Sequence, residues 1–537
     1  MSNDKPAASP NLLAALIPIV SLIGLLSANV YLYGEDSSYG PNQIALLMSA
    51  AIAAAVGLFY KIPFAQMSKG IEKAIGSALT AMLILLLIGS LAGTWMISGI
   101  VPAMIYYGLE ILNPQIFLFA SAIICAIVSV ATGSSWSTVA TVGLALFGIG
   151  TALGVSLPLT AGAIISGAYF GDKISPLSDT TNLAAAMAET DLFGHIKYML
   201  WTTVPSFVIA CAIYLAIGYG TDVGSIGADT SYLKAEVASQ FDTLSPVLFL
   251  VPVVVLVMVL RKVDAVAALL VGAVLGGVFA IVFQPTVVAN VSGMADEDSY
   301  LKKSYAAFTN SMAGETRAVS AEQAAAWQAE LDEKKLAAAR AQVNDPELTM
   351  ESFVASGETL EAEFPELEAK LSAASLLKGK GMAGMLNTIW LIITAMCFGG
   401  IMEATGLLRR ITEPLIRFAK SDGSLVATTT GTCLFVNATA SDQYLAIVVP
   451  GRMYREAFED RGLAPENLSR TLEDAATVTS VLIPWNTCGA AQSSVLGVAT
   501  IAYAPFCFFN IISPFMTMLY GFLGIKIARA KTMPESE

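Results

Sequence analysis

Long apolar segments follow one another along most of the chain, separated by short polar stretches. The clearest apolar segments cover residues 12–30, 44–59, 74–96, 198–217, 245–260, 265–283 and 503–525. Most of them reach or approach the roughly 18 apolar residues with which a helix crosses a bilayer. The pattern therefore predicts an all-α polytopic membrane protein.

A polar run, GDKISPLSDTTNLAA at residues 171–185, interrupts this pattern. Charge at bilayer depth is costly, so such residues usually line a bundle interior or a water-filled cavity. Pro176 removes a backbone donor and breaks a helix, which frees carbonyl oxygens. Oxygen-rich side chains beside an unwound backbone suit a hard cation such as Na⁺. The run therefore predicts an ion path, the alternative being a polar loop at the membrane surface.

The distribution of charged residues between the apolar segments predicts the orientation of the chain. Basic residues cluster after the second apolar segment and at the C-terminus, whereas acidic residues follow the first: Lys61, Lys69, Lys73, Lys526, Arg529, Lys531, Glu35 and Asp36. Because cytoplasmic loops are enriched in Lys and Arg, we expect both termini in the cytoplasm. The acidic segment 221–242 is then outside, so the two halves of the chain begin on opposite sides.

The second half also repeats the spacing of the first. TGSSWST at residues 132–138 precedes Pro176, and NATASDQ at residues 437–443 precedes Pro484 by nearly the same distance. A shift of 308 residues superposes Pro176 on Pro484, Gly133 on Ser441, Ser134 on Asp442, Trp136 on Tyr444, Ser178 on Asn486 and Asp179 on Thr487. We predict two inverted-topology repeats, each with a polar interruption and a Pro-broken helix, as in secondary transporters.

These features divide the chain into four parts. Residues 1–220 form the first transmembrane repeat, and residues 221–284 form an outer loop with the first two spans of the second repeat. Residues 285–380 are a polar insertion expected on the outer face, and residues 381–537 complete the second repeat. Within the insertion, AEQAAAWQAELDEKKLAAARAQ at residues 321–342 predicts an amphipathic soluble helix. We favour a tolerated insertion over a lid or a docking element, because surface insertions cost little stability.

Composition agrees with a membrane protein. The 537 residues are 55% hydrophobic and 13% charged, with a mean hydropathy of +0.67, whereas a soluble domain has about 25% charged residues. The net charge of −13 argues against nucleic-acid binding. The chain has no P-loop, HExxH or GxSxG motif, so ATP-driven transport and common intramembrane hydrolysis lack support. We expect a transporter that is not an enzyme and needs no cofactor.

The run GDKISPLSDTTNLAA closely resembles the signature segment of the NhaC family of Na⁺/H⁺ antiporters. Two further segments also resemble sequences of that family: TGSSWSTVATVG and LEDAATVTSVLIPWNTCGA. The resemblance covers about residues 10–527 without the insertion. It implies two re-entrant hairpins with tips at TGSSWST and NATASDQ, and helix breaks at SPLSDTTN and IPWNTCG. It also implies Na⁺/H⁺ exchange across the cytoplasmic (inner) membrane, with a homodimer left open.

An antiporter needs a group that holds either Na⁺ or a proton, and a carboxylate of suitable environment does so. We expect Asp179 to be this group, with neutral oxygens from Ser178, Thr180 and Asn182. A Na⁺ site is predicted at Asp179, Ser178 and Ser134. Further candidates for binding an ion or substrate are Ser135, Ser137, Asn437, Thr439, Asp442, Asn486 and Thr487. Asp179 and Asp442 are close enough to couple if the tips converge; the alternative is that they only cap helices.

Three other sites leave alternatives open. Asp172 and Lys173 are candidates for a proton-linked or gating ion pair. Glu403 is either a proton carrier or a partner for Arg409. His195 is expected to be an exposed capping residue rather than a pH sensor.

The transported solute is a separate question. The alternative to Na⁺/H⁺ exchange is Na⁺- or H⁺-coupled transport of a small organic acid or amino acid, such as malate/lactate exchange, which one branch of the resembled family performs. A substrate carboxylate would need a cation, for which Lys173 and Arg452 are candidates. Few arginines lie at apparent membrane depth, which favours transport of ions alone.

Overall fold

The computed structural model describes residues 10–530, apart from 34–36, 38, 112, 221–229, 262, 318, 320, 344, 356–359, 361 and 363. The acidic residues Glu35 and Asp36, part of the acidic segment 221–242, and Lys531 thus lie outside the described residues. The described chain is almost entirely helical, as the apolar pattern predicts. Its single described sheet is a two-stranded ribbon.

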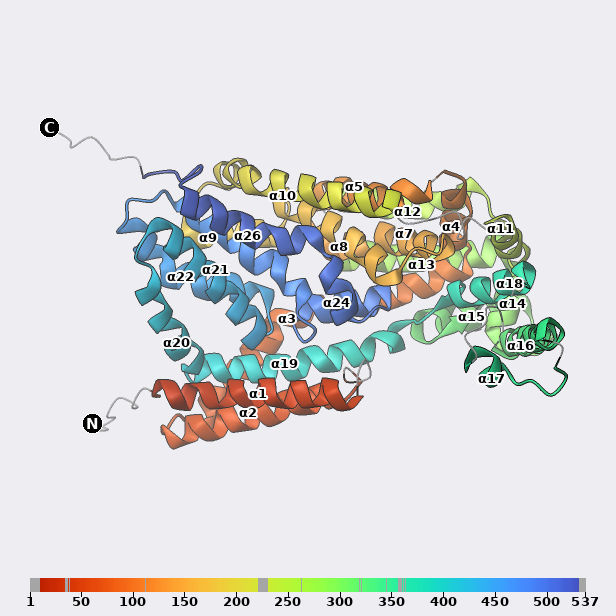
Figure 1. Ribbon diagram of the computed structural model, residues 1–537, viewed down its shortest axis with the longest axis horizontal. Coiled ribbons are helices and arrows are strands. Elements are labelled where there is room, and N and C mark those ends of the chain that lie inside the picture. The colour runs from red at the N-terminus through yellow and green to blue at the C-terminus, as the bar shows by residue number, and fades with distance from the viewer. Residues whose placement is uncertain are drawn as a thin grey trace.

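The first part of the chain forms helices up to the acidic segment. They are α1 (Leu12–Tyr33), α2 (Pro41–Phe59), α3 (Phe64–Ile97), α4 (Ile100–Ile111), α5 (Phe117–Thr132), α6 (Ser135–Thr138), α7 (Leu144–Ala152), α8 (Leu157–Ile174), α9 (Asp179–Ala188) and α10 (Leu192–Gly220). A turn of π-helix, η3 (Val139–Gly143), joins α6 to α7 without a break. In Figure 1, α5, α8 and α10 lie along one side of the molecule, opposite α1 and α2.

The middle of the chain first adds apolar helices to the bundle and then forms the insertion. It comprises α11 (Thr230–Ser239), α12 (Leu250–Leu260), α13 (Ala265–Phe283), α14 (Pro285–Ser292), α15 (Tyr300–Ala313), β1 (Thr316–Arg317), α16 (Ala321–Val343), α17 (Met350–Ala355), α18 (Pro365–Leu376) and β2 (Lys378–Gly379). The amphipathic helix expected at residues 321–342 is α16. Most of the insertion gathers at one end of the long axis (Figure 1), but α15 packs against α3, where Ser90 Oγ donates to the Met312 carbonyl at 3.0 Å.

The last part of the chain returns to the bundle. It comprises α19 (Leu386–Ala404), α20 (Leu407–Thr412), α21 (Asp422–Thr439), α22 (Gln443–Glu459), α23 (Pro465–Leu472), the π turn η8 (Glu473–Thr477), α24 (Thr487–Leu496), α25 (Thr500–Tyr503) and α26 (Phe508–Leu523). The start of α1 and the end of α26 lie at the same end of the molecule, opposite the insertion (Figure 1). This arrangement agrees with termini on one side and the insertion on the other, while the identity of each side stays a prediction.

Eight helices in the described part of the chain are long and apolar enough to cross a membrane. They confirm the polytopic all-α fold. Large apolar side chains such as Leu13, Val208 and Val282 are exposed on their outer surfaces, where lipid rather than water suits them. Two expected spans differ from simple crossings: residues 246–258 form a shorter apolar helix, and a bend of 58° separates Thr500–Phe506 from Phe508–Leu523.

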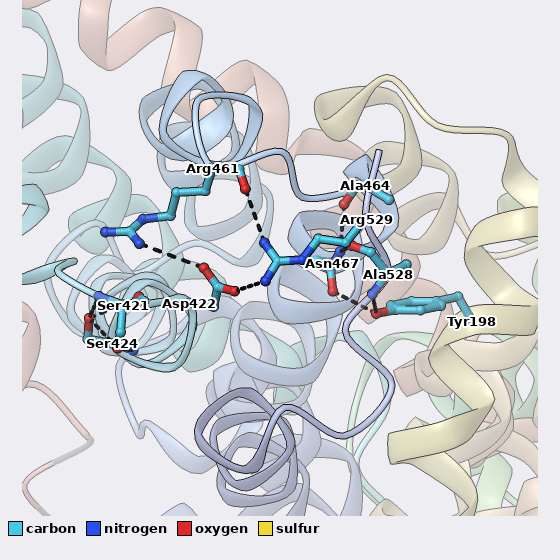
Figure 2. A network of polar contacts seen from close by, with 9 residues as sticks. All are labelled: Tyr198, Ser421, Asp422, Ser424, Arg461, Ala464, Asn467, Ala528 and Arg529. Atoms are coloured by element: carbon cyan, nitrogen blue, oxygen red, sulfur yellow. Dashed lines mark hydrogen bonds and ion pairs between the residues drawn. The ribbon is translucent and has the colours of Figure 1, made fainter. Parts of the chain in front are cut away.

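The chain after α26 is tied to three other elements (Figure 2). Arg529 pairs with Asp422 at 2.6 Å and donates to the Arg461 carbonyl at 3.1 Å. The Ala464 amide donates to the Ala528 carbonyl at 3.0 Å, and the Ala528 amide donates to the Tyr198 hydroxyl at 3.1 Å. Although single surface ion pairs contribute little, these bonds together join α10, α21 and the α22–α23 loop at the end of the molecule that carries the termini.

Candidate ion-binding site

The first proline break separates α8 from α9. Ser175, which precedes Pro176, is extended with φ −82° and ψ 128°, because the ring of a proline disfavours helical geometry in the residue before it. Ser178 is also extended and caps α9, accepting a hydrogen bond from the Thr181 amide at 3.4 Å. Because α8 stops at this break, the carbonyl groups of its last turn lack amide donors from a following turn. Thr181 Oγ1 compensates by donating to the Lys173 carbonyl at 2.9 Å.

The first tip lies between α5 and α6, at the expected TGSSWST sequence. Gly133 ends α5 with φ +68°, and Ser134 caps α6 by accepting from the Ser137 amide at 3.2 Å. A Cβ atom on Gly133 would lie 2.6 Å from Leu177 Cβ and 2.7 Å from the Leu177 carbonyl carbon. Glycine is therefore required both by the left-handed backbone and by the close approach of the tip to the break.

Gly133→Ala is expected to separate the tip from the break. The left-handed strain alone costs about 1–2 kcal/mol, and the contact with Leu177 adds to it. We expect a lower melting temperature and weakened Na⁺ binding in the purified protein. Gly431→Ala is the control, since Gly431 lies within α21 and a Cβ atom added there would meet no neighbouring element within 4 Å. A Gly133→Ala protein with unchanged melting and Na⁺ binding would show that the tip does not need this close packing.

The second half repeats this local geometry at the predicted shift. Ser441, the counterpart of Gly133, is also left-handed at φ +60°. Asp442, the counterpart of Ser134, caps α22. Ile483 before Pro484 is extended, and Asn486 caps α24 as Ser178 caps α9. The agreement supports the equivalence of the two halves, while their inverted orientation stays a prediction.

One cavity of about 130 Å³ brings both tips and both breaks together. Its polar lining comes from five parts of the fold: Ser77 and Thr80 of α3; Ser134 and Ser135 of the first tip; Asp172, Asp179 and Thr180 around the first break; Asp442, Gln443 and Tyr444 of the second tip; and Thr487 and Cys488 of the second break. No Lys, Arg or His stands among the described residues that line it. The cavity therefore has the character of a cation site.

The three cavity carboxylates differ in surroundings. Asp172 is 5% exposed; Ser135 Oγ donates to its Oδ2 at 2.7 Å, and its Oδ1 has no hydrogen-bond partner in the described part of the protein. Asp442 is 2% exposed and accepts from the Leu445 amide at 2.8 Å. Asp179 is exposed, and its Oδ2 accepts from the Tyr444 hydroxyl. Asp172 is thus the buried oxygen donor with unused capacity.

The capping alternative holds in part. Asp442 caps α22 and lines the cavity at the same time. Asp179 is the first residue of α9, whose cap is Ser178. Tyr444, near the start of α22, contacts Asp179 and so joins the second tip to the first break. This contact does not by itself bring Asp179 next to Asp442, and their coupling stays a prediction.

Other predicted site residues do not line the cavity. Asn182 turns back to the break and donates to the Pro176 carbonyl at 3.0 Å and the Ser178 carbonyl at 2.6 Å. Asn486 donates to Asn437 Oδ1 at 3.1 Å, so these two residues support the second break. Ser178, Ser137 and Thr439 are buried but do not line this cavity; Ser137 lines a separate apolar cavity, and Thr439 Oγ1 donates to the Phe435 carbonyl at 2.7 Å.

Lys173 does not pair with Asp172. Its fully buried ammonium contacts Asp474 and donates to Ser513 Oγ at 3.1 Å. Since side chains of neighbouring residues on a helix point about 100° apart, Asp172 faces the cavity while Lys173 faces the turn η8. The sequence-based idea of an Asp172–Lys173 pair is thus replaced by an ion pair between residues 301 positions apart.

The alternative of a Glu403–Arg409 pair and the expected exposure of His195 are not found, whereas a proton-carrying role of Glu403 stays a prediction. Glu403 of α19 pairs with Lys73 of α3 at 3.2 Å, whereas Arg409 pairs with Glu413 at 2.7 Å. Glu403 does not line the cavity. The expected exposure of His195 was wrong, because α10 buries it completely against α23, where its Nδ1 lies 2.7 Å from Ser469 Oγ.

Sequence reasoning missed several residues of this region. Tyr444 could have been found, because it occupies the position of Trp136 in the shifted alignment. Ser77 and Thr80 belong to the long apolar helix α3 and gave no separate signal. Asp474 and its neighbour Glu473 are both fully buried in η8. The signal that could have revealed them is the presence of two adjacent acidic residues in the otherwise uncharged sequence LEDAATVTS.

Comparison with known proteins identifies the family. The model of the Na⁺/H⁺ antiporter family matches residues 167–295 and 361–525. The chain is 34% identical over 490 residues to the Na⁺/H⁺ antiporter NhaC of Alkalihalophilus pseudofirmus, covering 91% of this chain and 92% of the relative. The chain belongs to the NhaC family of Na⁺/H⁺ antiporters. The predicted resemblance is therefore confirmed.

Two further relatives are named as antiporters of organic solutes. A malate-2H⁺/Na⁺-lactate antiporter of Bacillus subtilis is 30% identical over 514 residues, covering 95% of each chain. The arginine/ornithine antiporter ArcD of Halobacterium salinarum is 32% identical over 526 residues, covering 97% of this chain and 94% of the relative. The relatives are thus transporters of several solutes on a shared scaffold.

Proposed function

We propose that this Na⁺/H⁺ antiporter binds Na⁺ and protons in turn in the cavity between its two tips and two breaks. The observation that carries the proposal is the lining itself, with Asp172, Asp179 and Asp442 present and no cationic side chain among the described lining residues. An ionised carboxylate in a bilayer-depth cavity is costly without a partner. Either Na⁺ or a proton removes that cost, and each excludes the other.

The described residues suggest how Na⁺ would be held. No three His, Cys, Asp or Glu side chains in the described ranges are grouped tightly enough to hold one metal ion. Hydroxyl oxygens would therefore complete the ion's coordination, and Ser134, Ser135 and Thr180 line the same cavity. Asp179 is the exposed carboxylate that an entering ion meets, and the buried Asp172 offers its unpartnered Oδ1.

Alternating access would follow from movement of the tips against the breaks. Tip contacts such as Gly133 with Leu177 and Tyr444 with Asp179 are the contacts that such a movement would change. In transporters built from inverted repeats, one group of helices rocks against the other around a central site. Inverted repeats, an inner-membrane location, cytoplasmic termini and a homodimer are parts of this proposal.

Exchange of an organic solute is the second candidate, and the names of two relatives support it. A carboxylate substrate would need a positive partner. Lys173 is turned away to Asp474, and Arg452 is exposed on α22. The acidic lining therefore favours cation exchange over uptake of an anionic solute.

Reconstituted proteoliposomes distinguish the two candidates. With an acidic lumen and the membrane potential clamped by K⁺ and valinomycin, external NaCl is expected to collapse the pH gradient measured by a fluorescent dye. Choline chloride is the control and is expected to leave the gradient in place. If neither Na⁺ nor Li⁺ has an effect, and the gradient instead drives uptake of malate or arginine, the proposed exchange is wrong.

A further inference from the structure

A second cluster of buried charges lies behind the cavity, on the turn η8. Asp474 in this turn contacts Lys173, and its other carboxylate oxygen accepts from Thr202 Oγ1 of α10 at 2.8 Å. Ser513 of α26 donates to Asp474 at 3.1 Å. Asp474 is thus a carboxylate with a full set of partners.

Glu473, the preceding residue, has the opposite surroundings. It is fully buried, and neither of its carboxylate oxygens makes a hydrogen bond of normal geometry with the residues that the structure describes, although the Thr477 hydroxyl of the same turn lies close to it. An ionised carboxylate without a partner in a protein interior costs far more than a neutral carboxylic acid. Lys173 donates to Asp474 and Ser513 and makes no hydrogen bond to Glu473, so it acts on Glu473 only at a distance, and the neutral form of Glu473 is the one that fits this conformation.

The charged groups that face Glu473 come mainly from α8. Lys173 and Asp172 of α8 and Asp474 of its own turn lie within electrostatic reach of it. Arg470, one turn earlier, is buried but directed to the Lys526 carbonyl and the Tyr198 ring. His195 of α10 is buried within reach of Lys173 and Asp474.

The remaining elements packed on η8 are α9, α21, α22 and α26. Helix α26 has no charged residue. The charged side chains of the other three helices are exposed, half-buried or paired at the far end of their helix: Asp179, Asp422, Arg452, Arg455, Glu456 and Glu459. Lys173 is therefore the cation best placed to stabilise an ionised Glu473.

We propose that Glu473 is a proton-carrying residue separate from the Na⁺ cavity and coupled to it through the last turn of α8. That turn presents Asp172 to the cavity and Lys173 to η8. A Na⁺ ion beside Asp172 neutralises the negative charge that helps keep the proton on Glu473. The glutamic acid then releases H⁺, and the resulting carboxylate is stabilised by the attraction of the Lys173 ammonium at a distance, while Lys173 stays bound to Asp474. This inference rests on the Na⁺/H⁺ exchange proposed above.

The test counts the protons released when purified full-length protein binds Na⁺. The count comes from calorimetric titrations with NaCl in two buffers of different ionisation enthalpy. We expect Glu473→Gln to bind Na⁺ but to release one proton fewer per Na⁺ than the wild type. Glu466→Gln, on α23 and half-buried, is the matched control and should release the wild-type number. An unchanged count in Glu473→Gln overturns the inference.

A structural effect is separated from a proton-carrying role by stability and by infrared spectroscopy. Glutamine resembles a protonated glutamic acid, so Glu473→Gln should melt near the wild-type temperature at neutral pH; a large loss would show that Glu473 is ionised and contradict the inference. If Glu473→Gln fails to fold, infrared spectra of the wild type and of Glu473→Asp still test the inference. A carboxylic-acid C=O band lost on Na⁺ addition should shift in Glu473→Asp, and an unshifted band overturns the inference.

The proteoliposome assay tells this failure apart from failure of the exchange itself. A wild-type protein that exchanges Na⁺ for H⁺, together with an unchanged proton count in Glu473→Gln, refutes only the role of Glu473. A wild-type protein without exchange refutes the proposed function on which that role rests.

Discussion

Replacing Asp179 with asparagine is expected to abolish Na⁺-driven proton movement while the protein stays folded. The substitution keeps the shape of the side chain but removes the charge at the exposed side of the cavity. Hydrogen bonds and contacts to a charged group contribute about 1.5–3 kcal/mol, so Na⁺ binding should weaken by about 10- to 100-fold. Calorimetric titration with NaCl measures the binding, and dye-loaded proteoliposomes measure the exchange.

Two further variants sharpen this result. Asp460→Asn removes an exposed carboxylate at the end of α22 and should behave as the wild type. Tyr444→Phe removes only the hydroxyl that donates to Asp179, so it should weaken binding less than Asp179→Asn. Near-normal exchange by Asp179→Asn would rule out its assigned role and transfer the exchangeable site to Asp172 or Asp442.

Lys173→Met is expected to produce the largest loss of stability. It would leave Asp474 buried and without its cation, and breaking a buried ion pair by removing one partner costs about 3–5 kcal/mol. Thermal unfolding in detergent, followed by tryptophan fluorescence, measures the change. The double variant Lys173→Met with Asp474→Leu should recover most of it, since apolar residues often replace a buried pair without loss. A single variant as stable as the wild type would show that the pair does not hold the fold together.

The sequence predicts the parts of the fold that depend on local chemistry. Apolar length predicts the spans, Pro176 and Pro484 mark the breaks, and Ser178 and Asn486 are residue types that cap the following helices. The 308-residue shift then brings the two tips and two breaks into correspondence. Convergence of these four segments at one cavity came from the family resemblance rather than from any residue pattern.

Contacts between distant segments could not be predicted in the same way. Lys173 and Asp474 are 301 positions apart, and the sequence offers Asp172 as a nearer partner that the helix directs to another face. His195 follows a polar turn, but the packing of α23 on α10 buries it. Glu403 meets Lys73 because α19 lies along α3. Each of these errors depends on which helices are neighbours, which hydropathy does not encode.

Competition between Na⁺ and protons is the central claim, and the pH dependence of Na⁺ affinity tests it most directly. The purified wild-type protein would be titrated with NaCl at several pH values between about 6 and 9. For each proton displaced, the apparent Kd for Na⁺ should rise about tenfold for each unit of pH decrease, within the range where the carboxylates are protonated. A Kd that stays constant across this range would contradict a shared site for the two ions.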